Sequence, residues 1–145
     1  MSGCRMKRLL TTLVILTERF TPSLAVGYEM KRSDLVYTDG LYYKKSTTEP
    51  FTGKVVGDRQ GTLRKGKWHG PFARFYASES LWTKGTFKNG KAQGEWVSYQ
   101  RNGKLWKKGT YKDGKEEGLW VYFNKDGTKD TVLSGTWRDG EKVSD

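Results

Sequence analysis

Few residues of this chain could carry out covalent chemistry. The 145 residues include one histidine, His69, and one cysteine, Cys4. His69 lies in a predicted turn between strands, where an exposed loop histidine is the simplest interpretation, and Cys4 lies close to the N-terminus. We therefore expect no Cys–His pair, no Ser–His–Asp triad, no multi-histidine metal site and no disulfide.

Two adjacent carboxylates, Glu116 and Glu117, could act as an acid and a base. Neighbouring strand residues point to opposite faces of a sheet, and the pair replaces Ala92-Gln93 of a similar segment. These carboxylates are therefore predicted to be turn charges. No phosphate-binding glycine loop precedes a helix, so we predict that the protein is not an enzyme, has no catalytic or metal-binding residue and uses no cofactor.

Aromatic and cationic side chains repeat at a spacing that favours binding. Trp82 and Lys84 recur 24 residues later as Trp106 and Lys108. Because alternate residues of a strand share a face, all four are expected on one face, with equivalent residues roughly 10 Å apart. Such a stripe can stack sugars or bases and hold phosphates. The alternative is that the tryptophans pack over neighbouring strands and hold the sheet together.

The segments that carry this stripe belong to a repeat. Gly61-Thr62-Leu63 recurs three times, at spacings of 24, 24 and 26 residues, as Gly85-Thr86-Phe87, Gly109-Thr110-Tyr111 and Gly135-Thr136-Trp137. A second block alternates with the first: Gly70-Pro71-Phe72, Gly94-Glu95-Trp96 and Gly118-Leu119-Trp120. A fixed period of this length is typical of a repeat architecture.

Turn dipeptides separate the blocks: Asp39-Gly40, Asn89-Gly90, Asn102-Gly103, Asp113-Gly114, Asp126-Gly127 and Asp139-Gly140. Such pairs accept the positive φ of type I′ turns, which join antiparallel strands. They predict an all-β fold, an antiparallel meander of repeated β-hairpins in one open single-layer sheet, with strand order following chain order. Ser78-Glu79 stands where a later repeat has Asn102-Gly103, which predicts a less regular turn.

At these residues the sequence resembles the MORN (membrane occupation and recognition nexus) repeat, in a bacterial variant similar to the YwqK-type antitoxin family. The resemblance covers residues 53–145, and Asp34–Gly53 looks like the front end of a bacterial subgroup. It implies a MORN-like sheet and a role in protein or membrane binding. An antitoxin role is implied only by the family label.

The N-terminal residues differ from the rest. A basic start, Met6-Lys7-Arg8, precedes an apolar run at 9–16 and small residues that end at Ala25. This order is typical of a secretory signal peptide. We expect a signal peptide with a short leader helix at 1–25, a hairpin and a segment leading into the repeats at 26–52, and the MORN-like repeat domain at 53–145. Periplasmic or secreted localisation follows, with no transmembrane span in the mature form; a cytoplasmic protein is the alternative.

Charge and composition suggest the class of partner. The formal net charge is +11, and aromatic residues make up 14% of the chain. A basic surface favours anionic partners. We expect binding of another protein or an anionic envelope polymer through the sheet face or edge, and the open edge strands allow self-association. A cytoplasmic antitoxin-like protein that neutralises a partner toxin is the alternative function, and nucleic acid is the least favoured partner.

Overall fold

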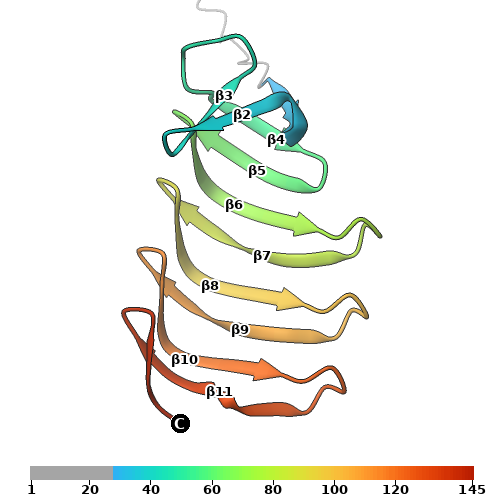
Figure 1. The fold of residues 1–145 in the computed structure, drawn as a ribbon, viewed down its shortest axis with the longest axis vertical. Coiled ribbons are helices and arrows are strands. Elements are labelled where there is room, and N and C mark those ends of the chain that lie inside the picture. The colour runs from blue at the N-terminus through green and yellow to red at the C-terminus, as the bar shows by residue number, and fades with distance from the viewer. Residues whose placement is uncertain (1–27) are drawn as a thin grey trace, which may run out of the picture.

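The computed structural model describes residues 28–145 of the chain, and almost all of them belong to one twisted stack of hairpins (Figure 1). Ten strands form an open sheet in the order β1-β4-β5-β6-β7-β8-β9-β10-β11-β12. From β4 onward each strand pairs antiparallel with the next one in sequence, which confirms the predicted meander. The strands are β1 (Glu29–Lys31), β4 (Gly53–Val56), β5 (Arg59–Arg64), β6 (Lys67–Phe75), β7 (Leu81–Lys88), β8 (Lys91–Tyr99), β9 (Leu105–Lys112), β10 (Lys115–Phe123), β11 (Lys129–Arg138) and β12 (Glu141–Ser144).

The N-terminal part departs from the predicted strand order. Strand β1 pairs in parallel with β4, and β2 (Leu35–Thr38) and β3 (Leu41–Lys44) form a separate two-stranded sheet after the 3-10 helix η1 (Arg32–Asp34). The β2–β3 hairpin leaves the main sheet because its buried residues, Leu35 and Tyr42, pack with those of the first repeat. Within residues 28–145 no helix is long and apolar enough to span a membrane. The predicted leader helix lies outside the described residues.

Each outgoing strand of a repeat bends at a glycine. Gly70, Gly94 and Gly118 have φ angles of 90°, 74° and 75°, a region that side chains with a Cβ rarely adopt. Strands β6, β8 and β10 therefore turn sharply along their length, as Figure 1 shows. The bends explain why a glycine opens the second block of every repeat, and they create an inner side to which the aromatic residues point.

Aromatic rings fill the inner side of the bent sheet. The buried rings of Trp68, Trp96, Trp120 and Tyr122 are joined through partly buried neighbours such as Phe87. Most of the contacts in this row are edge-to-face, for example 5.0 Å between the centroids of Phe87 and Trp96. Edge-to-face pairs stabilise beyond the area that they bury. The row therefore runs along the repeats as a continuous aromatic core.

The Gly-Thr block provides the surface on which each indole lies. A Cβ atom at Gly85 would come within 2.2 Å of the Trp96 ring, so only glycine fits beneath it. The indole N–H of Trp96 donates a hydrogen bond to the backbone oxygen of Thr86 at 3.2 Å. Trp120 repeats this arrangement over Gly109 and Thr110, with a hydrogen bond of 3.1 Å. The Gly-Thr pair thus recurs in the sequence because each copy holds one indole of the aromatic core.

Two kinds of turn join the strands. In Asp39-Gly40, Lys65-Gly66, Asn89-Gly90, Asp113-Gly114 and Asp139-Gly140 both residues have positive φ, as a type I′ turn requires. In the loop from Gln100 to Lys104 only Gly103 has positive φ, and its N–H donates to the Gln100 oxygen at 2.9 Å. The type I′ prediction is therefore wrong for Asn102-Gly103 and Asp126-Gly127. Their longer loops place one left-handed residue after an ordinary turn.

The turn at Ser78-Glu79 is as regular as its later copies. Tyr76 N–H donates to Ser80 O, and Glu79 N–H donates to Tyr76 O, both at 2.9 Å. Glu79 takes the place of Gly103, with a φ of 63°. The expectation of a less regular turn is wrong because the loop's hydrogen bonds hold a non-glycine residue in the left-handed region.

We expect Glu79→Gly to raise the free energy of unfolding by about 1 kcal/mol, because glycine adopts this φ without the strain of a Cβ. Urea denaturation measures the change. Glu79→Ala is the matched control: it removes the same carboxylate but keeps the Cβ, and should leave stability nearly unchanged. Equal stabilisation by both substitutions would show that the charge, and not the backbone, is responsible.

Candidate binding site

Two β-bulges place the tryptophans of the predicted stripe on the inner side of the sheet, among the core rings. Phe75 pairs with Leu81 while Arg74 pairs with Thr83, so Trp82 is an extra residue in β7. The pairing of β8 with β9 skips Trp106 in the same way. A bulge breaks the alternation of faces, which turns both tryptophans to the inner side.

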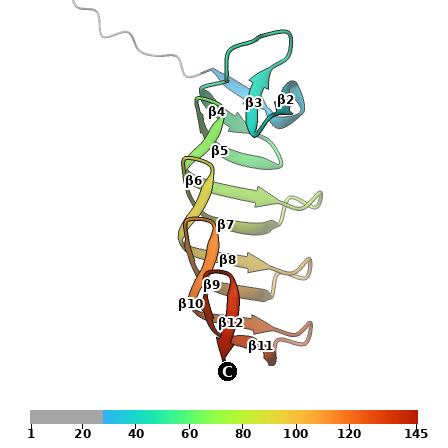
Figure 2. The same cartoon turned by 60° about the vertical axis from the view of Figure 1, so that its left-hand side comes forward.

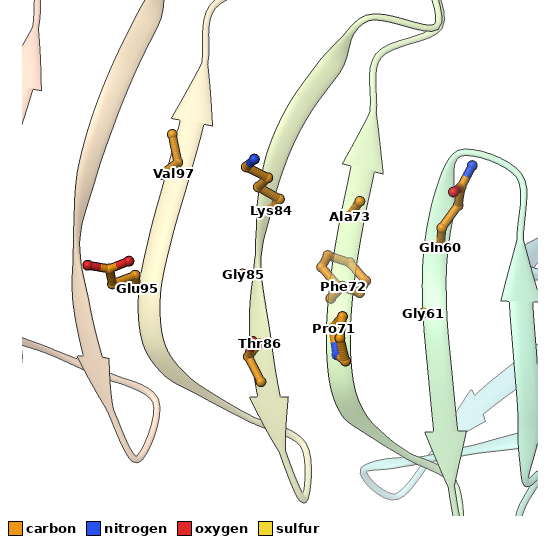
Figure 3. A pocket seen from close by; sticks show the side chains of 10 residues that line it. All are labelled: Gln60, Gly61, Pro71, Phe72, Ala73, Lys84, Gly85, Thr86, Glu95 and Val97. Atoms are coloured by element: carbon orange, nitrogen blue, oxygen red, sulfur yellow. The ribbon is translucent and has the colours of Figure 1, made fainter.

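The two lysines of the stripe remain on the outer face. Lys84 pairs with Ala73 on one side and Val97 on the other, and Figure 3 shows these three residues on neighbouring strands. Lys108 lies beside Val97 on the same face. The expectation that the four residues share one face is therefore wrong, because strand parity does not survive the bulges. Their role in binding stays a prediction.

The tryptophans line a hollow at the loop end of the hairpins, called the inner hollow below. It has a volume of about 780 Å³. Its walls come from three successive loops and the strands beside them: Tyr76, Trp82, Gln100, Arg101, Asn102, Trp106, Phe123, Asn124, Lys125 and Asp130. Sequence reasoning found only the two tryptophans, because the loop residues differ from one repeat to the next.

The aromatic wall has one fixed and one accessible tryptophan. The Trp82 ring stacks on Tyr76, with centroids 5.3 Å apart, and the guanidinium carbon of Arg74 lies 4.0 Å from the Trp82 centroid. Trp106 is 39% exposed, the only tryptophan among the exposed large apolar residues of the described chain. Among the aromatic residues that line the hollow, Trp106 is therefore the most exposed and the best placed to contact a ligand.

The polar wall of the hollow is held in place by hydrogen bonds within and between repeats and by a cation–π contact. The side-chain amide of Gln100 donates to the backbone oxygen of Asn124 at 2.8 Å. Asn102 accepts from the Lys104 N–H at 2.9 Å, and the Arg101 guanidinium carbon lies 5.1 Å from the Tyr76 centroid. A wall that is already ordered loses little conformational entropy when it binds.

A half-buried cation separates the inner hollow from the aromatic core. The Lys107 ammonium lies 5.5 Å from the Trp106 centroid, 5.2 Å from that of Trp120 and 5.5 Å from that of Tyr122. Burial lowers the pKa of Lys107, and the charge of Glu116 opposes that shift. Cation–π attraction compensates part of the lost hydration. Thr83 has the same place one repeat earlier, so this cation is specific to the second repeat.

Glu116 and Glu117 lie within β10 and not in the turn where the sequence predicted them, and both accept hydrogen bonds. Tyr111 donates a hydrogen bond from its hydroxyl to Glu116 at 3.2 Å, and burial followed by the Glu116 charge raises the pKa of Tyr111. Glu117 accepts the Asp139 N–H at 3.1 Å. His69 likewise accepts the Asn89 N–H at 3.2 Å, so it lies within β6 and ties two repeats together instead of lying free in a loop. No group of three potential metal ligands occurs among residues 28–145.

The hairpin that carries Trp106 has a recognised pattern. Residues 92–113 match the family model described as a MORN repeat variant. This match supports a MORN-repeat protein. The matched segment runs from β8 through the Gln100–Lys104 loop to the type I′ turn after β9, and it therefore contains one wall of the inner hollow. A search of curated proteins finds no match to the chain.

Proposed function

We propose that this MORN-repeat protein is a non-enzymatic binding protein whose inner hollow holds a peptide segment of a partner protein. The observation that carries the proposal is the half-exposed Trp106 in the wall of a hollow whose polar side is already ordered. Tryptophan and arginine contribute most of the binding energy in protein interfaces when they lie in such preformed sites.

The hollow offers two kinds of contact to a peptide. Trp106 and Phe123 provide apolar surface for one inserted side chain. Arg101 and Lys125 favour a carboxylate beside that side chain, although Asp130 restricts how much negative charge the hollow tolerates. A partner segment with an apolar side chain flanked by a single acidic residue therefore fits best. An anionic envelope polymer is the other class of partner suggested by the net charge of +11.

Export is part of the proposal and rests on the sequence of residues 1–25. If a signal peptide is removed after Ala25, the mature protein begins at Val26 and meets its partner outside the cytoplasm. N-terminal sequencing of protein recovered from its native cells tests this directly. An intact leader on cytoplasmic protein would instead favour the antitoxin-like alternative.

Capture by variants tests the binding role. The tagged full chain and its Trp106→Ala and Arg101→Ala variants are cross-linked in native cells, and a protein retained by the wild type is purified and titrated against all three. We expect each substitution to weaken binding at least about tenfold, as for a central interface residue. Lys45→Ala is the control, since Lys45 is exposed, does not line the hollow and should be dispensable for binding. Equal affinity of all variants, with β-type circular dichroism intact, would refute the site.

A further inference from the structure

The outer face of the sheet carries a continuous array of cations, called the basic face below. Its members lie on strands β5 to β10 and all are exposed: Arg64, Lys67, Lys84, Lys88, Lys91, Lys108, Lys112 and Lys115. On β7, Lys84 and Lys88 flank Thr86, and on β9 two lysines flank Thr110 in the same way. The array follows from the repeat because the positions opposite the aromatic core recur in each return strand.

Three successive hairpins place like charges directly opposite each other. Each type I′ turn in this region is flanked by a cross-strand pair of cations, namely Arg64 and Lys67, Lys88 and Lys91, and Lys112 and Lys115. Directly opposed like charges destabilise a hairpin. The ion pairs found among residues 28–145 involve Lys54, Arg59 and Lys142, so none of the eight cations has a carboxylate partner within 4 Å.

Stacking of the turns aligns these pairs along the molecule. The N–H of Gly90 donates to the Trp68 oxygen at 2.8 Å, and that of Gly114 donates to the Ala92 oxygen at 2.9 Å. Each turn is thereby fixed beside the preceding repeat, and Figure 2 shows the turns one above the next. Successive repeats are two strands apart, so the pairs recur roughly every 10 Å.

Protection of sheet edges does not account for the basic face. Lysines commonly prevent edge strands from pairing with other chains. The edge strands here are β1 and β12, whereas the basic face covers interior strands that are already paired on both sides. Solubility is achieved by mixing both signs, but the acidic residues interspersed with the eight cations of this face are few: Glu95 and Glu117, which both lie opposite Thr110, and the turn residue Asp113.

We propose that the basic face binds an extended polyanion, a linear polymer with phosphate groups along its backbone. Regularly spaced cation pairs match a repeated charge, and the exposed hydroxyls of Thr62, Thr86 and Thr110 can donate hydrogen bonds to phosphate oxygens. The described part of this face has no exposed aromatic ring on which a base could stack, which favours a polymer without bases over single-stranded nucleic acid. This site is independent of the inner hollow and of any protein bound there.

Binding of long-chain inorganic polyphosphate by the full chain tests the inference. We expect affinity to fall steeply as salt rises, because several phosphates are contacted at once. Tripolyphosphate, which reaches one turn only, should bind at least about tenfold more weakly. Single-stranded oligonucleotides of equal charge and anionic vesicles are the competing ligands, and tighter binding of either would overturn the choice of polymer.

A matched pair of variants separates a site from general attraction. The first variant carries Lys88→Gln, Lys91→Gln, Lys112→Gln and Lys115→Gln. The control loses the same charge elsewhere, through Lys31→Gln, Lys44→Gln, Lys45→Gln and Lys129→Gln. We expect the first to lose roughly a hundredfold in affinity and the control only a few fold, while Trp106→Ala binds polyphosphate normally. Equal losses in the two quadruple variants would show that only net charge matters and would overturn the site.

Removal of the cations also has an expected effect on folding. Because Lys88→Gln and Lys112→Gln each relieve a cross-strand repulsion, the first quadruple variant should be at least as stable as the wild type in urea. A folded variant that no longer binds supports the inference directly. If it unfolds more readily than the control, the lysines stabilise the sheet and the basic face is structural.

Discussion

Replacement of Gly109 by alanine is expected to lower the free energy of unfolding by about 3 kcal/mol, the upper end of the usual cost of overpacking a core. The new Cβ would lie 2.2 Å from Cδ2 of Trp120 and 2.4 Å from Cε2. Trp120 cannot retreat, because its ring is fully buried, its N–H is bonded to Thr110 and Tyr111 packs 4.8 Å away. Urea denaturation monitored by tryptophan fluorescence measures the loss.

Gly118→Ala is the control for this prediction. Gly118 has a φ of 75° and nothing within 4 Å of an added Cβ, so its substitution costs only backbone strain, about 1 kcal/mol. Gly109 lies outside the left-handed region, so its substitution tests packing alone. Similar losses at both positions would mean that the indole does not rest on Gly109 as described.

Local chemistry made most of the fold predictable. A type I′ turn is specified by two residues, so Asn89-Gly90 and Asp113-Gly114 identify their hairpins without knowledge of any distant contact. Short turns then oblige neighbouring strands to pair, and the meander from β4 to β12 follows. The parallel pairing of β1 with β4 depends on long-range packing and has no comparable signal.

The faces of the sheet were harder to predict. The alternation of side chains along a strand places Trp82 and Lys84 on the same face only if β7 pairs residue for residue with its neighbour. The bulge opposite Arg74 adds one residue to β7 and breaks this alternation. That insertion becomes visible only when the partner strand is known. A second bulge, at Trp106, likewise places Trp106 and Lys108 on opposite faces, and the sequence alone does not reveal it. The inner hollow could not be predicted either, because its remaining walls come from loops whose residues differ between repeats.

The basic face, by contrast, can be predicted from the repeated sequence. Lys88 and Lys91 flank one turn, and Lys112 and Lys115 flank the next, so the pattern is visible in the printed sequence. Its significance depended on the strand order, because the same lysines on edge strands would serve to prevent aggregation. On interior strands the lysines protect no edge, so the fold itself does not explain why mutually repelling lysines are kept there.

Trp120→Ala is expected to lower the free energy of unfolding by about 3–5 kcal/mol, as for other fully buried aromatic residues. Trp120 is 0% exposed, lies over Gly109 and contacts the rings of Tyr111 and Tyr122. Its removal would leave a cavity in the middle of the aromatic row that the backbone-paired strands β9 and β10 cannot close. Loss of the cooperative urea transition, or a midpoint far below that of the wild type, is the expected observation.

Trp106→Ala removes the same side chain 14 positions earlier and should cost only about 1 kcal/mol. Trp106 is 39% exposed on a bulge, and the Lys107 ammonium lies 5.5 Å from the centroid of its ring. The difference between the two stability losses bears on function, because a tryptophan that the fold does not need can be kept for contact with a partner. If Trp106→Ala destabilises the protein as severely as Trp120→Ala, the inner hollow belongs to the core and the proposed peptide site is wrong.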